Sequence, residues 1–195
     1  MKMLIVYTYP NHTSLNYAFL QKVIKGSGEN AKIEEVQVLD LYEEGFNPLL
    51  MFNEQKRRRD MHTDPGIEKY RQQLTWADKI VFIYPIWWGR PPAMLLGYID
   101  QLFASNFAYR DTNGLFPEGL LKGKSVVCVS TMKGPANYPF LWLNSAHKIL
   151  MKRALFGFVG IKNVKFFEFG NMESPKGNQT KKLEKVYRYF RQVAH

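Results

Sequence analysis

The 195-residue sequence predicts an α/β fold in which a five-stranded parallel sheet is covered by helices on both faces. Short apolar, β-rich segments alternate along the chain with longer segments of helical spacing. The first of them, residues 3–8, is a continuous apolar run, which is typical of a strand buried on both faces. The chain has no internal repeat, and its length fits a single domain over residues 1–195.

Five segments are expected to be strands: 3–8 (MLIVYT), 32–41 (KIEEVQVLDL), 80–85 (IVFIYP), 124–131 (KSVVCVST) and 164–169 (VKFFEF). The second is more polar than the others, as expected near a sheet edge. Crossovers between parallel strands are right-handed, and five strands suit the doubly wound, flavodoxin-like order 2-1-3-4-5.

Helical spacing predicts the segments between the strands. In the first helix, Gly26 and Gly28 are expected as stop signals. Pro91 and Pro92 suit the opening of the third, which is apolar on most faces and is therefore expected to be heavily covered, partly by another subunit. Residues 43–64 are expected to form an extended connection with one short helix. The expected helices are residues 14–28, 67–80, 93–107, 143–158 and 179–193.

Cysteine use and hydropathy indicate an intracellular, cytoplasmic protein. Cys128 is the sole cysteine, so no internal disulfide can form, and its place inside a strand predicts an inert thiol. The first ten residues lack the apolar core and cleavage site of a signal peptide. The longest apolar run, IVFIYPIWW, is far shorter than a membrane span, so no membrane insertion is expected.

A formal net charge of +10 would attract anionic partners. The densest basic run, residues 56–59, is flanked by acidic residues and has no interleaved aromatic residues, so we expect a solvated helical face and no nucleic-acid site. His12, His62 and His195 show no spacing to acidic or cysteine partners, and no metal site is predicted.

Three loops follow the first, third and fourth strands. They read TYPNHTSLN (8–16), YPIWWGRPP (84–92) and STMKGPANY (130–138). Ligands of doubly wound sheets bind outside the carboxyl ends of the strands, where the strand order reverses. Because these three strands are expected to be neighbours, their loops are predicted to build one site.

The first loop contains neither of the standard glycine-rich nucleotide motifs. It offers Thr13, Ser14 and Asn16 beside the amino end of the first helix, which suits a phosphate group. The alternative is that Thr13 or Ser14 only caps this helix.

The second loop is stiffened by Pro85, Pro91 and Pro92, so residues 86–89 (IWWG) are expected to hold one conformation. Flat side chains and fixed backbone amides suit a planar heterocycle with polar edges. A hydrophobic dimer surface is the alternative, and the two are compatible.

The third loop and the following helix supply candidate reactive groups. Lys133 could stabilise negative charge on a ligand, and the Tyr138 phenol could donate a hydrogen bond at a reacting edge. Both residues are also common on ordinary surface loops. His147 lies on the apolar stripe of its helix, where a packed core histidine is the alternative to a catalytic one.

Three stretches together resemble the NAD(P)H:quinone oxidoreductases, the DT-diaphorase family of flavodoxin-like flavoproteins. HTSLNYAF (12–19) is similar to the family's first loop, and residues 82–109, FIYPIWWGRPPAMLLGYIDQLFASNFAY, are similar to its most specific segment. The third stretch is the loop at 130–138, and the resemblance extends over about residues 3–170. The sequence does not show the long C-terminal extension of the family's animal members, and it resembles the short bacterial members more. These bacterial members often use FMN.

The resemblance implies a homodimeric flavoenzyme that reduces quinones, and also azo or nitro compounds, with NADH or NADPH in a ping-pong mechanism. FMN is the expected cofactor and FAD the alternative. Tyr138 falls at the family's catalytic tyrosine, and His147 lies one helical turn beyond the family's catalytic histidine position, which is Asn144 here. The residues implied to bind the flavin are Tyr9, Thr13, Ser14, Leu15, Asn16, Pro85, Ile86, Trp87, Trp88, Gly89, Ser130, Thr131, Met132 and Lys133.

Departures from the family pattern leave the acceptor open. Tyr9 replaces a histidine of the first loop, and Met132 and Lys133 replace two glycines that approach the flavin. Two other functions are compatible with the resemblance: an ancillary regulatory flavoprotein of a potassium-efflux transporter, and a one-electron flavodoxin-type carrier.

Overall fold

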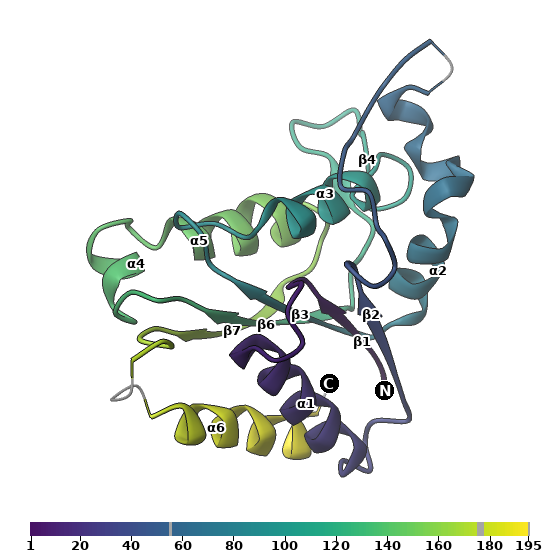
Figure 1. The fold of residues 1–195 in the computed structure, drawn as a ribbon. Helices are drawn as coiled ribbons and strands as arrows, with labels where there is room; N and C mark the ends of the chain where they lie inside the picture. The colour runs from purple at the N-terminus through teal and green to yellow at the C-terminus, as the bar shows by residue number, and fades with distance from the viewer. Residues whose placement is uncertain (55, 175–177, 195) are drawn as a thin grey trace.

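The computed structural model describes residues 1–54, 56–174 and 178–194. Its central sheet is parallel throughout and has the order β2-β1-β3-β6-β7, which confirms the predicted order (Figure 1). The two edge strands are less buried than the three central ones. The strands are β1 (Lys2–Tyr7), β2 (Glu35–Asp40), β3 (Lys79–Pro85), β6 (Ser125–Thr131) and β7 (Asn163–Phe169).

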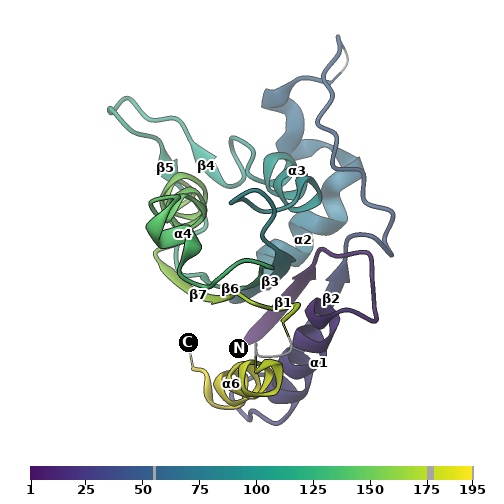
Figure 2. The same cartoon turned by 60° about the vertical axis from the view of Figure 1, so that its left-hand side comes forward.

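Helices cover both faces of the sheet, as Figures 1 and 2 show. Helices α1 and α6 lie side by side below it, and the remaining helices lie above it. A two-stranded antiparallel ribbon of β4 (Tyr109–Arg110) and β5 (Glu118–Gly119), which the sequence pattern does not signal, follows α3. The helical elements are α1 (Leu15–Gly28), η1 (Arg58–Thr63), η2 (Pro65–Ile67), α2 (Glu68–Trp76), α3 (Ala93–Leu102), α4 (Tyr138–Leu141), α5 (Ala146–Ile149), η3 (Leu150–Gly157) and α6 (Gln179–Gln192).

Alternate residues of each central strand enter two separate cores. In β1, Met3 and Ile5 pack with α1 and α6, whereas Leu4 and Val6 pack with the helices of the opposite face. Each fully buried aliphatic side chain contributes about 1.5–3 kcal/mol relative to an exposed one. Burial on both faces explains why these strands are continuous apolar runs.

Gly26 does not stop the first helix; it lies inside α1, where α6 packs against it. A Cβ at this position would lie 2.6 Å from the carbonyl oxygen of Tyr187 and 3.2 Å from the amide nitrogen of Arg191. The glycine therefore serves close helix packing, and the helix ends only at Gly28.

The prediction of one regular helix over residues 143–158 is wrong in two respects: the first turn is not helical, and the later part is not an α-helix. Asn144 and Ser145 have φ values of 46° and 56°, in the left-handed region, so the chain turns sharply and α5 begins only at Ala146. Beyond it the backbone continues as the π-helix η3. The helix expected at 93–107 ends early, at Leu102, because the backbone leaves helical geometry at Phe103.

The described residues of the connection, 43–54 and 56–64, have the expected extended course and include the short helix η1. Within residues 1–54, 56–174 and 178–194, no helix combines the length and the apolar character needed to cross a bilayer.

Candidate functional site

A cavity of about 390 Å³ lies at the carboxyl ends of β1, β3 and β6. Its walls come from the three loops singled out in the sequence and from the segment after β7. Ser14, Asn16 and Thr131 are polar, and the second-loop residues Pro85, Ile86 and Trp87 are largely apolar. The lining residues are Tyr9, Ser14, Leu15, Asn16, Pro85, Ile86, Trp87, Thr131, Met132, Lys133, Met172 and Glu173.

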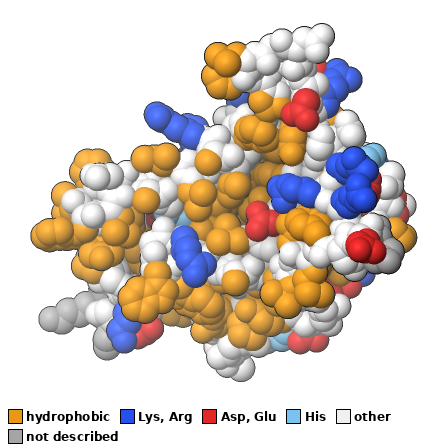
Figure 3. Space-filling view, turned by 90° about the horizontal axis from the view of Figure 1, so that it is seen from above, with side chains coloured by type: hydrophobic (Ala, Val, Ile, Leu, Met, Phe, Trp, Pro, Cys, Tyr) orange, Lys and Arg blue, Asp and Glu red, His pale blue; other side chains and the backbone are white. Residues whose placement is uncertain are grey.

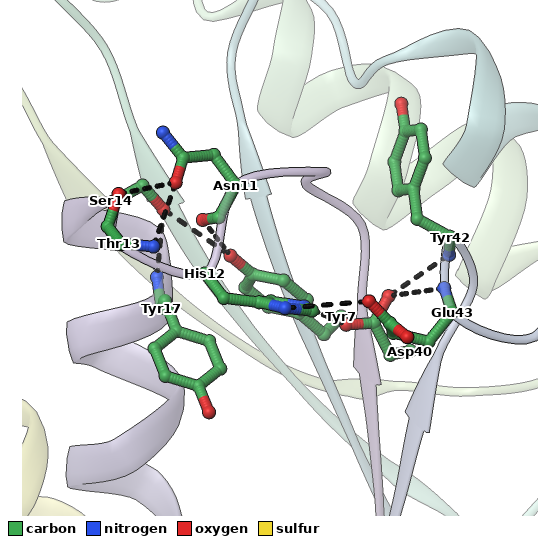
Figure 4. A network of polar contacts seen from close by, with 9 residues as sticks. All are labelled: Tyr7, Asn11, His12, Thr13, Ser14, Tyr17, Asp40, Tyr42 and Glu43. Carbon is green, nitrogen blue, oxygen red and sulfur yellow. Dashed lines mark hydrogen bonds and ion pairs between the residues drawn. The ribbon is translucent and has the colours of Figure 1, made fainter.

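The first loop ends in the cap of α1 (Figure 4). Ser14 is the N-cap, and its Oγ accepts a hydrogen bond of 3.2 Å from the Tyr17 amide. Thr13 is directed instead to Asn11, whose Oδ1 accepts from both its amide and its hydroxyl. The helix cap is therefore Ser14 and not Thr13. Ser14 also lines the cavity, where a ligand can reach it, whereas Thr13 does not line the cavity.

A polar network fixes the outer side of this loop to the end of β2 (Figure 4). His12 Nε2 lies 2.6 Å from Asp40 Oδ2, and the other carboxylate oxygen of Asp40 accepts from the Tyr42 and Glu43 amides. Beneath the loop, the Tyr7 hydroxyl donates to the Asn11 carbonyl. Burial raises the pKa of Tyr7 to about 12, so this phenol stays neutral and structural.

The second loop contains a tight two-residue turn. Trp87 and Arg90 exchange backbone hydrogen bonds of 3.0 and 3.1 Å, and the two residues between them, Trp88 and Gly89, have φ values of 53° and 73°. Two positive φ values in a two-residue turn are common for glycine and asparagine and unusual for tryptophan. Trp88 and Gly89 do not line the cavity; the Trp88 side chain is 96% exposed.

Buried contacts join the three loops to one another. Thr131 Oγ1 donates a hydrogen bond of 2.9 Å to Asn16 Oδ1, and the Ile86 amide donates to the Thr131 carbonyl at 2.7 Å. The Tyr9 and Trp87 rings meet edge to face, with 6.2 Å between their centroids. The cavity walls are therefore held by direct bonds between segments that are far apart in the sequence.

Met172 and Glu173 are lining residues that the sequence reasoning missed. They follow β7, the edge strand, and carry no local motif. Glu173 pairs with Lys133, with 3.0 Å between Oε2 and Nζ, and both side chains are largely exposed. Such an exposed pair contributes at most about 1 kcal/mol, so Lys133 can exchange this partner for a ligand.

The remaining predicted site residues lie outside the cavity wall. Ser130 is buried behind it, where its Oγ donates to the Phe167 carbonyl at 3.4 Å. Tyr138 begins α4, and its side chain is 44% exposed.

His147 does not face the site and is only 1% exposed. Its Nδ1 lies 2.7 Å from Glu168 Oε1 and its Nε2 lies 2.8 Å from the Tyr84 hydroxyl. Because a carboxylate only accepts, Nδ1–H donates to Glu168, and Nε2 forms its hydrogen bond with the Tyr84 hydroxyl. This position agrees with the alternative that His147 is a packed core residue. Both of its ring nitrogens form hydrogen bonds with other side chains of the protein.

Two further groups in this region have shifted pKa values. Burial would raise the pKa of Glu168, but hydrogen bonds from His147 and Lys148 outweigh it, and the pKa is lowered. Burial raises the pKa of Cys128 to about 12, as expected for an inert thiol inside a strand.

Comparison with known proteins identifies the family. A family model described as a flavodoxin-like fold matches residues 1–193. The chain belongs to this flavodoxin-like family. The three loops that line the cavity thus occupy the ligand-binding edge expected of a doubly wound sheet.

Relatives of this flavodoxin-like protein include oxidoreductases. An uncharacterized NAD(P)H oxidoreductase of Haemophilus influenzae is 32% identical over 174 residues, which are 88% of this chain and 85% of the relative. An FMN-dependent NADH:quinone oxidoreductase of Caldicellulosiruptor bescii is 29% identical, with coverage of 84% and 83%. The crystal structure of Smu.1420 from Streptococcus mutans has a TM-score of 0.88 and 38% identity, and covers 99% of this chain and 100% of that one. These similarities confirm the resemblance to NAD(P)H oxidoreductases and quinone reductases.

The cavity of this flavodoxin-like protein has walls that suit a flavin nucleotide. Within the described part of the chain, no group of three or more His, Cys, Asp or Glu side chains is arranged to hold a metal ion. The cavity size falls within the roughly 300–1,000 Å³ of small-molecule sites. Its polar wall lies at the start of α1, whose first amide groups have no partners inside the helix and attract anions. Its apolar wall, at Pro85 to Trp87 and Met132, suits a flat ring.

Proposed function

We propose that this protein is a flavin-dependent NAD(P)H oxidoreductase that holds FMN in the cavity and reduces quinones. One observation supports this above all: a single cavity joins the amino end of a helix to a flat apolar wall, and three loops with oxidoreductase-like sequences line it. Named relatives with FMN and NADH:quinone activity supply the class of cofactor and acceptor.

The polar wall would hold the phosphate of FMN. Ser14 Oγ caps α1 and lies 3.4 Å from the Tyr7 hydroxyl, and its hydroxyl proton would turn from this long contact to a phosphate oxygen. The Asn16 carbonyl oxygen is taken by Thr131, which leaves its NH₂ group directed to the ligand side. The positive end of the α1 dipole adds to these contacts, so the phosphate needs no glycine-rich loop.

The apolar wall would orient the ring. Pro85 and Ile86 are fixed because the Ile86 amide bonds to β6, and Trp87 is fixed by its bridge to Arg90. A rigid wall lowers the entropy lost on binding a planar ligand. A bound flavin would supply the two-electron redox chemistry that links NADH or NADPH to a quinone.

Two further side chains, one in the cavity wall and one outside it, would act on the bound ligands. Lys133 lines the cavity and would stabilise negative charge that develops on the ligand. Tyr138 has an exposed phenol that would donate a hydrogen bond to the hydride donor or the acceptor. His147 is left out of this set because Glu168 and Tyr84 occupy both of its ring nitrogens.

Purification of the chain with its cofactor tests the proposal directly. We expect yellow protein that releases FMN on denaturation and oxidises NADH or NADPH with a simple quinone. Tyr138→Phe should lower kcat/KM for the quinone by about tenfold to a hundredfold, as for a lost hydrogen bond in the transition state, without loss of FMN. Protein that remains colourless after reconstitution with FMN, and inactive with both nicotinamides, would refute the function.

We further propose that the active form is a homodimer. Hydrophobic side chains gather on the face above α3 and α5 (Figure 3), and several large ones are strongly exposed there and in neighbouring loops. Apolar exposure on this scale is typical of interaction surfaces. The most exposed side chains of the set are Trp88, Leu115, Phe116, Phe140 and Trp142. Sedimentation equilibrium should give twice the mass of 22.8 kDa.

A further inference from the structure

A second cavity, of about 340 Å³, lies at the amino ends of β6 and β7, where Ser125 and Asn163 begin these strands. It is thus at the end of the strands opposite to the candidate site. The described residues that line it include three lysines and no acidic side chain. They are Lys122, Gly123, Lys124, Ser125, Gly160, Lys162 and Asn163.

Lys124 is held in place at this cavity. Its ammonium donates hydrogen bonds to the backbone carbonyls of Thr75 and Ala77, at 2.9 and 2.5 Å. A lysine anchored by two carbonyls loses less conformational freedom when it binds a ligand than a freely rotating one. Lys162, directly before β7, is an exposed residue that lines the cavity.

Lys79 places a further positive charge directly behind the cavity. It is 2% exposed, and its ammonium donates a hydrogen bond of 2.7 Å to Ser125 Oγ. Lysine has no acceptor, so Ser125 must accept here, and its own hydroxyl proton is free to point into the cavity. Burial lowers the pKa of Lys79, because it penalises the charged ammonium. An anion beyond Ser125 would favour that charged form.

The charges around the cavity do not balance. Glu118 pairs with Lys122 but is shared with Arg110. Asp78 acts on Lys124 electrostatically and also accepts from the Lys2 amide. Lys79 donates to Ser125 from behind and Lys162 lines the cavity, so both add positive charge at this site.

We infer that this cavity is a binding site for a phosphate-type oxyanion. Lys124 and Lys162 provide charged donors, and the Ser125 hydroxyl, with Lys79 behind it, provides a neutral donor polarised by a cation. The ligand chemistry is a phosphate or phosphomonoester group, carried by a free small molecule or by a lipid headgroup. The site is independent of the proposed redox function, because it lies at the other end of the sheet.

Titration of the purified protein with inorganic phosphate tests this site, with potassium chloride at matched ionic strength as reference. We expect saturable heat in calorimetry and a saturable rise in Tm. Lys162→Ala and Ser125→Ala should each weaken phosphate binding by about tenfold, since each removes one donor to a charged ligand. The matched control is Lys32→Ala, which removes an exposed lysine near another strand's amino end and should leave the affinity unchanged.

Lys79→Met provides a second, independent readout. Lys79→Met removes a buried cation. In the absence of phosphate, we expect this variant to unfold at the same denaturant midpoint as the parent protein or at a higher one. When phosphate is added, the variant should lose most of the rise in Tm that the parent shows. Binding to phosphatidylcholine vesicles only when they contain phosphatidic acid would identify a lipid headgroup as the source. Binding of inorganic phosphate without vesicle binding would identify a free ligand.

Three results would overturn the inference. The first is the lack of a saturable response to phosphate and to both kinds of vesicle. The second is an equal loss of binding in Lys32→Ala, which would indicate a general charge effect. The third is a loss of phosphate binding in Ser14→Ala but not in Lys162→Ala, which would assign the anion to the cavity at α1 and leave the proposed function intact.

Discussion

Thr131 and Asn16 are 115 positions apart in the chain, yet Thr131 Oγ1 donates a buried hydrogen bond of 2.9 Å to Asn16 Oδ1. This bond joins the end of β6 to the first turn of α1, directly at the wall of the cavity. It fixes the carboxamide of Asn16, so that the NH₂ group, and not the oxygen, is available to an anionic ligand. Stability and ligand binding are therefore coupled at one contact.

Thr131→Val should lower the free energy of unfolding by about 1–3 kcal/mol, because the Asn16 oxygen loses its donor. It should also weaken FMN binding, since the carboxamide is then free to rotate. Urea denaturation and a flavin fluorescence titration measure the two effects. Thr8→Val is the matched control: it removes a buried hydrogen bond to the Ile83 carbonyl outside the cavity and should cost stability alone. Equal FMN affinity in both variants would contradict the coupling.

Ser14→Ala should cost about 1 kcal/mol of stability through the lost helix cap, and should in addition reduce FMN affinity. The control is Asn178→Ala. Asn178 is the N-cap of α6, and its side chain accepts a hydrogen bond from the Lys181 amide. Asn178 has a φ of 49°, so alanine adds strain there and the control costs at least as much stability. FMN affinity should fall only in Ser14→Ala; a parallel fall in both variants would mean that Ser14 acts on binding through stability alone.

The carboxylate of Glu168 should make stability depend on pH in the acid range. Its pKa in the folded protein lies below that of the unfolded chain. The contribution is therefore fully present above the ordinary glutamate pKa of about 4.3, and it is lost as the pH falls through the lower, folded value. Glu168→Gln should lower the free energy of unfolding by roughly 1–3 kcal/mol at pH 7 and flatten this acid loss. Unfolding curves measured between pH 7 and the acid limit give the free energy of unfolding of both proteins at each pH. If the variant loses stability with falling pH as steeply as the parent does, Glu168 is not the source of the acid loss.

Cys128 should resist alkylation in the folded protein at pH 8. Its pKa of about 12 keeps the thiol protonated, and its side chain is fully buried. Labelling by iodoacetamide should therefore follow the rate of opening and accelerate in urea through the unfolding transition. Rapid stoichiometric labelling in native buffer would show that β6 opens locally.

Trp88→Asn should weaken the proposed dimer and leave the monomer fold intact. Asparagine tolerates the φ of 53° that Trp88 adopts, so the turn is preserved while the exposed ring is lost. Sedimentation at several concentrations should give a dissociation constant raised by at least tenfold, as for the loss of a hot-spot tryptophan. An unchanged constant would remove Trp88 from the interface.

The sequence by itself determined the sheet and the edge at which the cavity lies. Continuous apolar strands such as residues 3–8 and 80–85 are typical of a parallel sheet buried between two helical layers, and five such strands suit the order 2-1-3-4-5. That order brings the loops after β1, β3 and β6 to one edge. The loops that contain Ser14, Pro85 and Thr131 could therefore be placed at a common site from the expected strand order.

Only the tertiary structure decided which side chains of those loops face the cavity. Trp87 and Trp88 are adjacent in sequence, but the turn geometry directs one to the cavity and the other to solvent. His147 is turned inward by Glu168 and Tyr84, which lie on two different strands, and Glu173 reaches the cavity through its ion pair with Lys133. Such orientations depend on partners far away in the chain, and a local pattern carries no information about them.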